Sequence, residues 1–288
     1  MGVVPAETTA LKRILLTGAS AGIGLLTARL LCQMGHEVWG TARTLAKLPV
    51  IERFHPVILD LNDKHSIEAA FGAALLEAGY FDVLINNAGA GVFGPLESFS
   101  DDEFVAQFET LLLGPLRLIR LALPDMRARG TGLVVNVSSL AGEFPLPFMA
   151  PYSMFKAAMS AMSEGLGFEL AHTGVRVVDV RPGDFATNFH DSTRRIGSEL
   201  ASEYQPNLIR AWHAIDQNMK RAKSSRRVAD LLVAIVEGKV RGPVQVVGDI
   251  FQARMARLLA RIVRRSWVQW GIRKYYGLRR APRGKRGH

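Results

Sequence analysis

Residues 13–24 read RILLTGASAGIG, and their pattern is the strongest indication of the fold class. An apolar run of strand length leads directly into a glycine-rich turn, and a helical pattern continues from the turn to Cys32. Strand, glycine turn and helix start in this order form a site for a dinucleotide, because the glycines let the backbone approach a pyrophosphate at the positive end of the helix. The spacing is Gly-x-x-x-Gly-x-Gly, not the commoner Gly-x-Gly-x-x-Gly. Taken alone, the motif also fits an ordinary tight turn of small packing residues.

Short apolar runs recur beyond this stretch, with helical patterns between them. The runs lie at residues 14–16, 37–40, 57–59, 83–85, 133–137, 175–180 and 244–247. Alternation of this kind predicts an α/β fold, a Rossmann-type doubly wound parallel sheet with helices on both faces. Ligands of such sheets bind beyond the carboxyl ends of the strands. We expect one dinucleotide-binding and catalytic domain over residues 1–250 and a basic amphipathic extension over 251–288.

A second motif places Tyr152 and Lys156 four residues apart, with Ser139 thirteen residues before the tyrosine. Positions i and i+4 share one helix face, so the ammonium lies beside the phenol. The pKa of an unperturbed phenol is about 10, and a nearby cation favours the phenolate. The pair is therefore suited to general acid/base chemistry near neutral pH. A lone Tyr-x-x-x-Lys also arises by chance on solvated helices, so the surrounding motifs decide its meaning.

Those motifs stand in the order and register of a known family. The chain resembles the short-chain dehydrogenase/reductase family from about residue 11 to about 245, and within it the branch of hydroxysteroid and retinol dehydrogenases. The resemblance rests on residues 17–24, Asp60-Leu61, Asn86-Asn87-Ala88-Gly89, Asn136-Val137-Ser138-Ser139, Tyr152 with Lys156, and Arg181-Pro182-Gly183 followed by Thr187. It implies hydride transfer between a nicotinamide and a carbonyl or an alcohol.

The resemblance also assigns roles to single residues. Tyr152 becomes the acid/base, Lys156 lowers its pKa and binds the nicotinamide ribose, and Ser139 hydrogen-bonds the substrate oxygen. Ser138 is expected to be a structural neighbour and Asn136 a clamp on the backbone. The cofactor site then comprises Gly18, Ser20, Gly22, Ile23, Gly24, Asp60, Leu61, Asn87, Ala88, Gly89, Tyr152, Lys156, Pro182, Gly183 and Thr187. No metal site is expected, because the seven histidines are dispersed and there is one cysteine.

The end of the second apolar run indicates which nicotinamide cofactor is used. An acidic residue there would accept hydrogen bonds from the adenosine ribose and repel a 2′-phosphate. The chain instead has Arg43, whose planar guanidinium suits a phosphate, and no Asp or Glu lies between residues 40 and 48. NADP is therefore favoured over NAD.

One residue departs from the family pattern. The family usually has a catalytic asparagine where this chain has Leu111. A leucine cannot hold the water that links Lys156 to bulk solvent. Two functions stay open: an oxidoreductase whose proton relay uses another polar group, and a non-catalytic NADP(H)-binding sensor or interaction protein. Retention of Ser139, Tyr152 and Lys156 together favours the enzyme.

The segment at about 184–225 corresponds to the lid that covers the substrate in the family. From Leu208, apolar residues recur at helical spacing through Trp212, Ile215 and Met219, which predicts an amphipathic helix. Such a stripe ordinarily packs on a core. If it also lines the pocket, a steroid-, retinoid- or lipid-like ketone, aldehyde or alcohol fits better than a sugar. A β-ketoacyl thioester is disfavoured, because reductases of that class end soon after the last strand.

The basic character of the chain resides in its tail. Residues 251–288 contain twelve Lys and Arg and no Asp or Glu, which leaves 24 basic against 26 acidic residues elsewhere and argues against a nucleic-acid groove. A helix over 251–276 is predicted from apolar residues at helical spacing among arginines. These are Met255, Leu258, Leu259, Ile262 and Val263, with Trp267 and Trp270 near the end. The helix either lies on an anionic membrane or packs on the domain or a subunit partner, and RNA binding by residues 279–286 is a minor third interpretation.

Location and assembly complete the expectations. The chain has no run of eighteen apolar residues and no signal peptide, which favours a cytoplasmic protein with peripheral membrane association through the tail. The resemblance implies a homodimer or homotetramer formed through helices at about 102–128 and 152–172.

Overall fold

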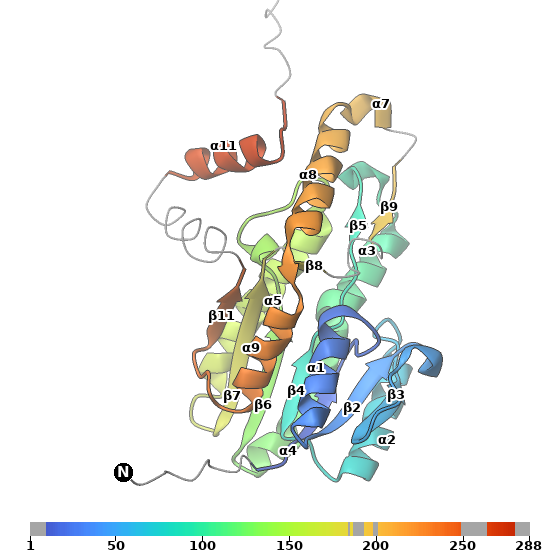
Figure 1. Ribbon diagram of the computed structural model, residues 1–288, viewed down its shortest axis with the longest axis vertical. Coiled ribbons are helices and arrows are strands. Elements are labelled where there is room, and N and C mark those ends of the chain that lie inside the picture. Colours follow the sequence, from blue (N-terminus) through green and yellow to red (C-terminus); the bar gives the residue numbers. More distant parts are fainter. Residues whose placement is uncertain (1–9, 184, 187–192, 198–200, 249–263, 280–288) are drawn as a thin grey trace, which may run out of the picture.

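A seven-stranded sheet forms the centre of the computed structural model, which describes residues 10–183, 185–186, 193–197, 201–248 and 264–279 (Figure 1). All pairings within it are parallel, and the strand order is β11-β7-β6-β4-β1-β2-β3. The strands are β1 Arg13–Leu16, β2 Glu37–Ala42, β3 Phe54–Ile58, β4 Val83–Asn86, β6 Gly132–Val137, β7 Val175–Pro182 and β11 Val244–Val247. Every apolar run predicted to be a strand contributes to this sheet, and the doubly wound parallel fold is confirmed.

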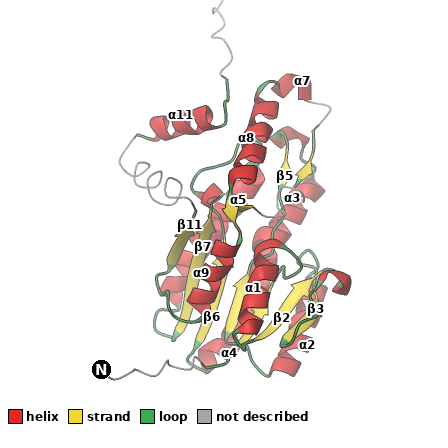
Figure 2. Ribbon diagram, in the orientation of Figure 1, coloured by secondary structure: helices red, strands yellow, loops and turns green. Residues whose placement is uncertain are grey.

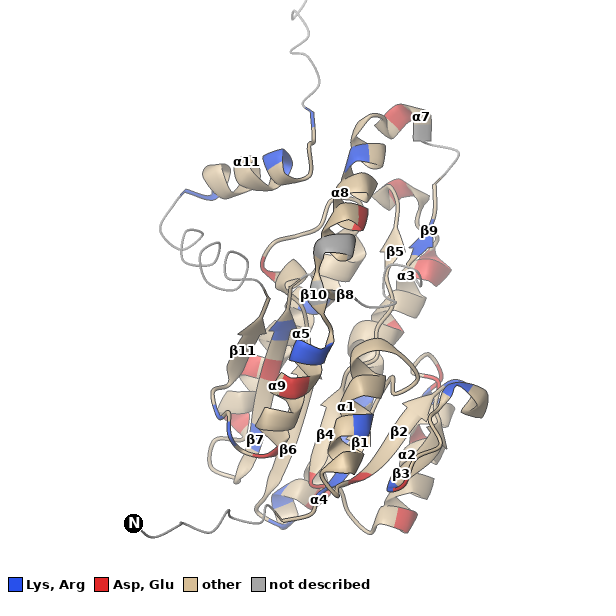
Figure 3. Cartoon of the chain, viewed as in Figure 1, with Lys and Arg blue, Asp and Glu red and all other residues tan. Residues whose placement is uncertain are grey.

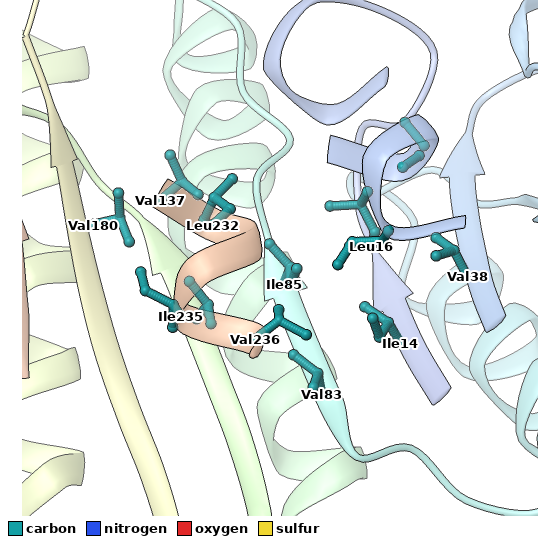
Figure 4. Packing of buried hydrophobic residues seen from close by; sticks show 14 of the residues in the cluster. Ile14, Leu16, Val38, Val83, Ile85, Val137, Val180, Leu232, Ile235 and Val236 are labelled. Atoms are coloured by element: carbon teal, nitrogen blue, oxygen red, sulfur yellow. The ribbon is translucent and has the colours of Figure 1, made fainter. Parts of the chain in front are cut away.

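Helices cover both faces of the sheet (Figure 2). One face packs against α1 (Gly22–Gln33) and α9 (Arg226–Val236), through a core in which Ile14, Ile85 and Val180 meet Leu232 and Ile235 (Figure 4). The other face packs against α2 (Lys64–Ala78), α4 (Gly114–Ala128) and α5 (Ala150–Glu169). The strands are apolar on both sides because neither face meets water.

The chain order explains where a ligand binds. From β1 the chain runs outward through β2 to β3, then crosses back to place β4 on the other side of β1. Parallel strands on either side of this reversal send their following loops apart, which opens a crevice at their carboxyl ends. The loops after β1, β2, β4, β6 and β7 therefore surround one site.

Smaller elements build the region above that edge. They are α3 Asp101–Phe108, the π-helix Glu109–Leu113, α7 Ala201–Tyr204, α8 Asn207–Arg221 and α11 Arg265–Tyr275, the 3₁₀ helices Leu45–Lys47, Leu96–Ser98 and Leu140–Gly142, and the short pairs β5 Val92–Phe93 with β9 Arg194–Arg195 and β8 Phe185–Ala186 with β10 Lys223–Ser224. Helix α8 rises beyond the sheet edge (Figure 1). The amphipathic helix predicted from Leu208 is thus observed, one residue earlier than the start of its stripe.

The tail is described in part. Helix α11 lies within the range 251–276 predicted to be helical, but the apolar stripe from Met255 to Val263 falls outside the described residues. Among the residues that the structure describes, no helix is long and apolar enough to cross a membrane.

Candidate active site

A cavity of about 460 Å³ lies at the carboxyl ends of the central strands. It collects nearly all the residues proposed from the sequence, although they come from seven separate segments. Those that line it are Gly18, Ser20, Gly22, Ile23, Gly24, Arg43, Asp60, Leu61, Asn87, Ala88, Gly89, Ser139, Tyr152, Lys156, Pro182 and Gly183. Thr187 lies outside the described residues.

The glycine turn is held tightly against the loop after β4. Gly18 has a φ of +72°, and a Cβ there would lie 2.9 Å from Cα of Ala88. A Cβ on Gly24 would lie 2.0 Å from the carbonyl oxygen of Gly18. Both positions therefore require glycine. The hydroxyl oxygen of Thr17 accepts hydrogen bonds from the backbone N–H groups of Asn87 (3.0 Å) and Ala88 (3.1 Å), which joins the two loops.

The start of α1 fits a pyrophosphate. Its N-cap, Ala21, provides no side-chain acceptor, and the first turn contains no acidic residue. The first amides of this helix consequently lack a side-chain cap where Gly22, Ile23 and Gly24 line the cavity. Amides at a helix N-terminus favour an anionic ligand. Arg43 lines the cavity from the end of β2, is exposed, and makes no hydrogen bond or ion pair to any described residue.

Tyr152 and Lys156 occupy the first turns of α5, inside the protein. Tyr152 is 8% exposed and Lys156 is 4% exposed. The lysine Nζ lies 5.9 Å from the centre of the tyrosine ring and donates a hydrogen bond of 2.7 Å to the carbonyl oxygen of Val137. Burial lowers the pKa of Lys156 to about 8, while the negative charge of Asp179 acts in the opposite direction. The ammonium is thus fixed beside the phenol, within the cavity.

The two serines after β6 differ in their surroundings. The hydroxyl of Ser139 lines the cavity, accepts a hydrogen bond of 3.0 Å from the backbone N–H of Ala141, and lies 3.4 Å from the carbonyl oxygen of Pro182. The hydroxyl of Ser138 donates to the carboxylate of Asp179, which is buried beside Arg181. Ser139 is therefore the serine available to a substrate oxygen.

From the sequence we expected the side chain of Asn136 to clamp the backbone, but it does not. It lies in the sheet interior, where its Oδ1 accepts from Asn86 (2.9 Å) and its Nδ2 donates to Ser163 on α5 (2.9 Å). All three side chains are buried, so the Asn136 amide has to form its hydrogen bonds with side chains of neighbouring elements. The network joins β4, β6 and α5 below the cavity.

Leu111 is fully buried in the π-helical turn between α3 and α4. A Cβ built on Gly89 would lie 3.2 Å from the Leu111 Cδ2 atom and 3.8 Å from the Lys156 Nζ atom. The leucine therefore lies in the immediate neighbourhood of the lysine. An apolar side chain in this place offers no hydrogen bond to the ammonium or to water. Single π-turns often mark functional sites, and in this one Thr110 lines the cavity while Leu111 is buried behind it.

The other end of the cavity is apolar. Its lining includes Leu146 and Met149 before α5, and Trp212, Ile215 and Met219 on α8, so the predicted stripe does reach the cavity. Trp212 also packs edge-on against Phe93, with ring centres 4.9 Å apart.

The sequence analysis missed several lining residues, among them Thr110, Thr193, Asn218 and Tyr276. Tyr276 belongs to the tail and follows directly after α11. No local sequence pattern predicts its position, because Tyr276 is far along the chain from the other segments that line the cavity. Among the described residues, no group of His, Cys, Asp and Glu could hold a metal ion.

Comparisons with known proteins match most of the chain. A family model described as short chain dehydrogenase matches residues 12–196. A 3-ketodihydrosphingosine reductase of Bacteroides thetaiotaomicron is 32% identical over 274 residues, which cover 92% of this chain and 98% of that protein. A short-chain dehydrogenase from Streptomyces avermitilis has a TM-score of 0.78 and 29% identity, covering 91% of this chain and 96% of that one. A metagenomic short-chain oxidoreductase in complex with NADP has a TM-score of 0.67 and 28% identity, covering 84% and 98% respectively.

Proposed function

The chain belongs to the short-chain dehydrogenase/reductase family, and from that membership we propose that it is an NADP(H)-dependent oxidoreductase of lipophilic ketones and alcohols. The observation that carries the proposal is the content of one cavity. Ser139, Tyr152 and Lys156 line it together with the uncapped start of α1 and the guanidinium of Arg43. One cavity thus contains a proton donor, a hydrogen-bond donor for the substrate oxygen, and backbone amides and a guanidinium that can bind phosphates.

The cofactor fits these residues in a definite direction. The pyrophosphate would rest on the first amides of α1, and Arg43 would bind the 2′-phosphate that distinguishes NADP from NAD. Asp60 and Leu61 would hold the adenine end, with Asn87, Ala88 and Gly89 along the channel. Lys156 would bind the nicotinamide ribose, beside Pro182 and Gly183. Thr187 stays a prediction from the family motif, because it lies outside the described residues. The exposed position of Arg43 without a partner among the described residues supports its assignment to the 2′-phosphate.

In the proposed mechanism, the bound cofactor supplies the hydride. Tyr152 donates the phenolic proton to the carbonyl oxygen as negative charge develops there, and Ser139 donates a hydrogen bond to the same oxygen. The ammonium of Lys156 stabilises the phenolate that remains. Because the pKa of Lys156 is about 8, this group keeps most of its charge near neutral pH. Alcohol oxidation uses the same groups in reverse.

The substrate class follows from the apolar end of the cavity. Apart from Asn218, the side chains that line the cavity from α8 and from the loop before α5 are aliphatic or aromatic. A sugar would leave its hydroxyls without partners against such walls, whereas an alkyl chain or fused ring system would gain by burial. The similarity to a 3-ketodihydrosphingosine reductase supports a lipid-like ketone over a steroid or a retinoid.

The deciding experiment is a screen of long-chain 3-keto lipids, steroids and retinoids with NADPH or NADP, followed by absorbance of the reduced nicotinamide. We expect turnover of at least one lipophilic class, abolished in Tyr152→Phe while NADPH binding survives. Cofactor binding without turnover of any carbonyl or alcohol would instead favour a non-catalytic NADP(H)-binding protein. The burial of Leu111 beside Lys156 favours that second candidate.

Two partner surfaces extend the proposal. Helix α11 exposes 65% of Trp267 and 54% of Trp270, and only Lys and Arg among charged residues lie on it (Figure 3). This composition suits the headgroup region of an anionic membrane, where lipophilic substrates dissolve.

The outer surface of α3 and α5 exposes Phe104, Met154 and Phe168, which suits the self-association of a homodimer or homotetramer.

A further inference from the structure

A tight turn ends α11. The backbone N–H of Leu278 donates to the carbonyl of Arg273 (2.9 Å), and that of Gly277 donates to Lys274 (3.2 Å). This pair of bonds is a Schellman motif, in which the residue after the cap takes a left-handed conformation. Gly277 has a φ of +64°, which a residue without a Cβ adopts at little cost. The turn directs residues 276–279, here called the strap, away from the helix axis.

The strap is fastened to α8 by polar contacts. The side chain of Asn207 donates through Nδ2 to the carbonyl of Arg279 (2.8 Å) and accepts through Oδ1 from the backbone N–H of the same residue (2.7 Å). Arg210 adds a longer hydrogen bond of 3.4 Å to the carbonyl of Gly277. An amide that pairs with both backbone groups of one residue fixes its position and direction. Leu278 adds apolar contact with the cluster around the substrate end of the cavity.

The two tyrosines at the start of the turn have opposite surroundings. Tyr275 is 47% exposed, whereas Tyr276 is 7% exposed and lines the cavity together with Trp212, Ile215 and Met219. The hydrogen bonds to α8 thus bring an aromatic ring from the tail into the lining of the cavity that also contains Tyr152. The family model matches residues 12–196, so both α8 and the strap lie beyond the segment that it describes.

We propose that the strap forms the far wall of the substrate end and that Tyr276 determines specificity for long or bulky lipophilic substrates. This inference rests on the proposed oxidoreductase function and names the part of the chain that selects the substrate. A short ketone is held at Ser139 and Tyr152 alone. A long-chain ketone extends past α8 and buries its alkyl portion against the ring of Tyr276. Asn207 is the positioning residue, because it acts through the strap.

The test compares Tyr276→Ala with Tyr275→Ala. The ring of Tyr275 packs edge-on against Tyr276 (ring centres 5.0 Å apart) but does not line the cavity. Each variant is assayed with a long-chain 3-keto lipid and with a short water-soluble ketone. For Tyr276→Ala we expect KM for the lipid to rise about tenfold, a typical effect of losing the burial of one aromatic contact, while kcat changes little. The kinetics of the short ketone and those of Tyr275→Ala should stay near wild type. Equal effects on both ketones, or no effect on either, would overturn the inference.

A second variant tests the fastening without altering the cavity wall. Asn207→Ala should raise KM for the lipid in the same direction, and it should add nothing in the Tyr276→Ala background, because both act through one contact. Additive effects in the double variant would show that Asn207 acts elsewhere.

Calorimetric titration of the NADPH-loaded protein with the corresponding long-chain alcohol provides a readout that needs no turnover. Binding weakened by Tyr276→Ala but not by Tyr275→Ala supports the wall even if no carbonyl is reduced, an outcome that rejects only the proposed activity. If the alcohol does not bind, or binds equally well to Tyr276→Ala and wild type, the inference that Tyr276 forms the wall is wrong.

Discussion

Replacing Lys156 by methionine should change how stability depends on pH. The lysine is buried, and its pKa is lowered by burial from 10.5 to about 8. Between these two values the unfolded chain binds a proton that the folded protein does not. Stability therefore rises with pH across this window, and the cost of burying the charge is fully present below about pH 8. Methionine has a similar length and no titrating group.

The size of the effect follows from the pKa difference. Each pKa unit corresponds to about 1.4 kcal/mol, so the whole shift amounts to roughly 3 kcal/mol, of which most appears between about pH 8 and about pH 10.5. Loss of the hydrogen bond to Val137 adds a constant that does not depend on pH. The quantity to compare is thus the slope with pH, not the stability at one pH.

Urea unfolding of the cofactor-free proteins at several pH values measures this difference. We expect wild type to gain about 2–3 kcal/mol relative to Lys156→Met over the window, with equal urea dependence in both proteins. Lys47→Met, at an exposed position, is the control and should run parallel to wild type. A constant difference between wild type and Lys156→Met would refute the argument, because it would mean that the lysine titrates alike in both states.

Three further outcomes are expected. Arg43→Asp should weaken NADPH binding about tenfold to a hundredfold and strengthen NADH binding, as measured by fluorescence titration, because a charge-assisted hydrogen bond to the 2′-phosphate is replaced by repulsion; equal weakening of both cofactors would contradict this. Leu111→Asn should raise kcat for a lipophilic ketone if proton relay limits turnover, at a loss of stability from placing an amide in a fully buried site; an unchanged kcat would show that relay is not limiting. Joint replacement of Trp267 and Trp270 by serine should reduce co-sedimentation with anionic liposomes and leave activity on a water-soluble ketone intact, whereas unchanged sedimentation would count against the membrane surface.

Strands of the sheet centre were predictable because they are buried on both faces and read as continuous apolar runs. The edge strand β3 was predicted less well. It begins at Phe54, three residues before the predicted run, and Ile58 is 54% exposed, because β3 pairs only with β2 and has one side towards solvent. Its alternation of buried and exposed residues hides the strand from a search for apolar runs.

The site divides in a similar way. The glycine turn and the pair Tyr152 and Lys156 carry local spacing that a sequence reveals, because their chemistry depends on one turn or one helix face. The position of Tyr276 depends on a contact with α8 made across a long stretch of chain. Helical periodicity identifies which face of a helix is apolar, but it does not state which surface receives that face.

The hydroxyl of Thr17 has a consequence for cofactor affinity. It accepts two backbone N–H groups from the loop after β4, and it lies 3.4 Å from the carbonyl of Ile85, so its hydrogen-bonding capacity is satisfied before any ligand arrives. The glycine turn and the facing loop are therefore already immobilised relative to each other. A loose turn would lose conformational entropy when the dinucleotide binds. Here that entropy is lost during folding, so its loss does not reduce the affinity for the dinucleotide.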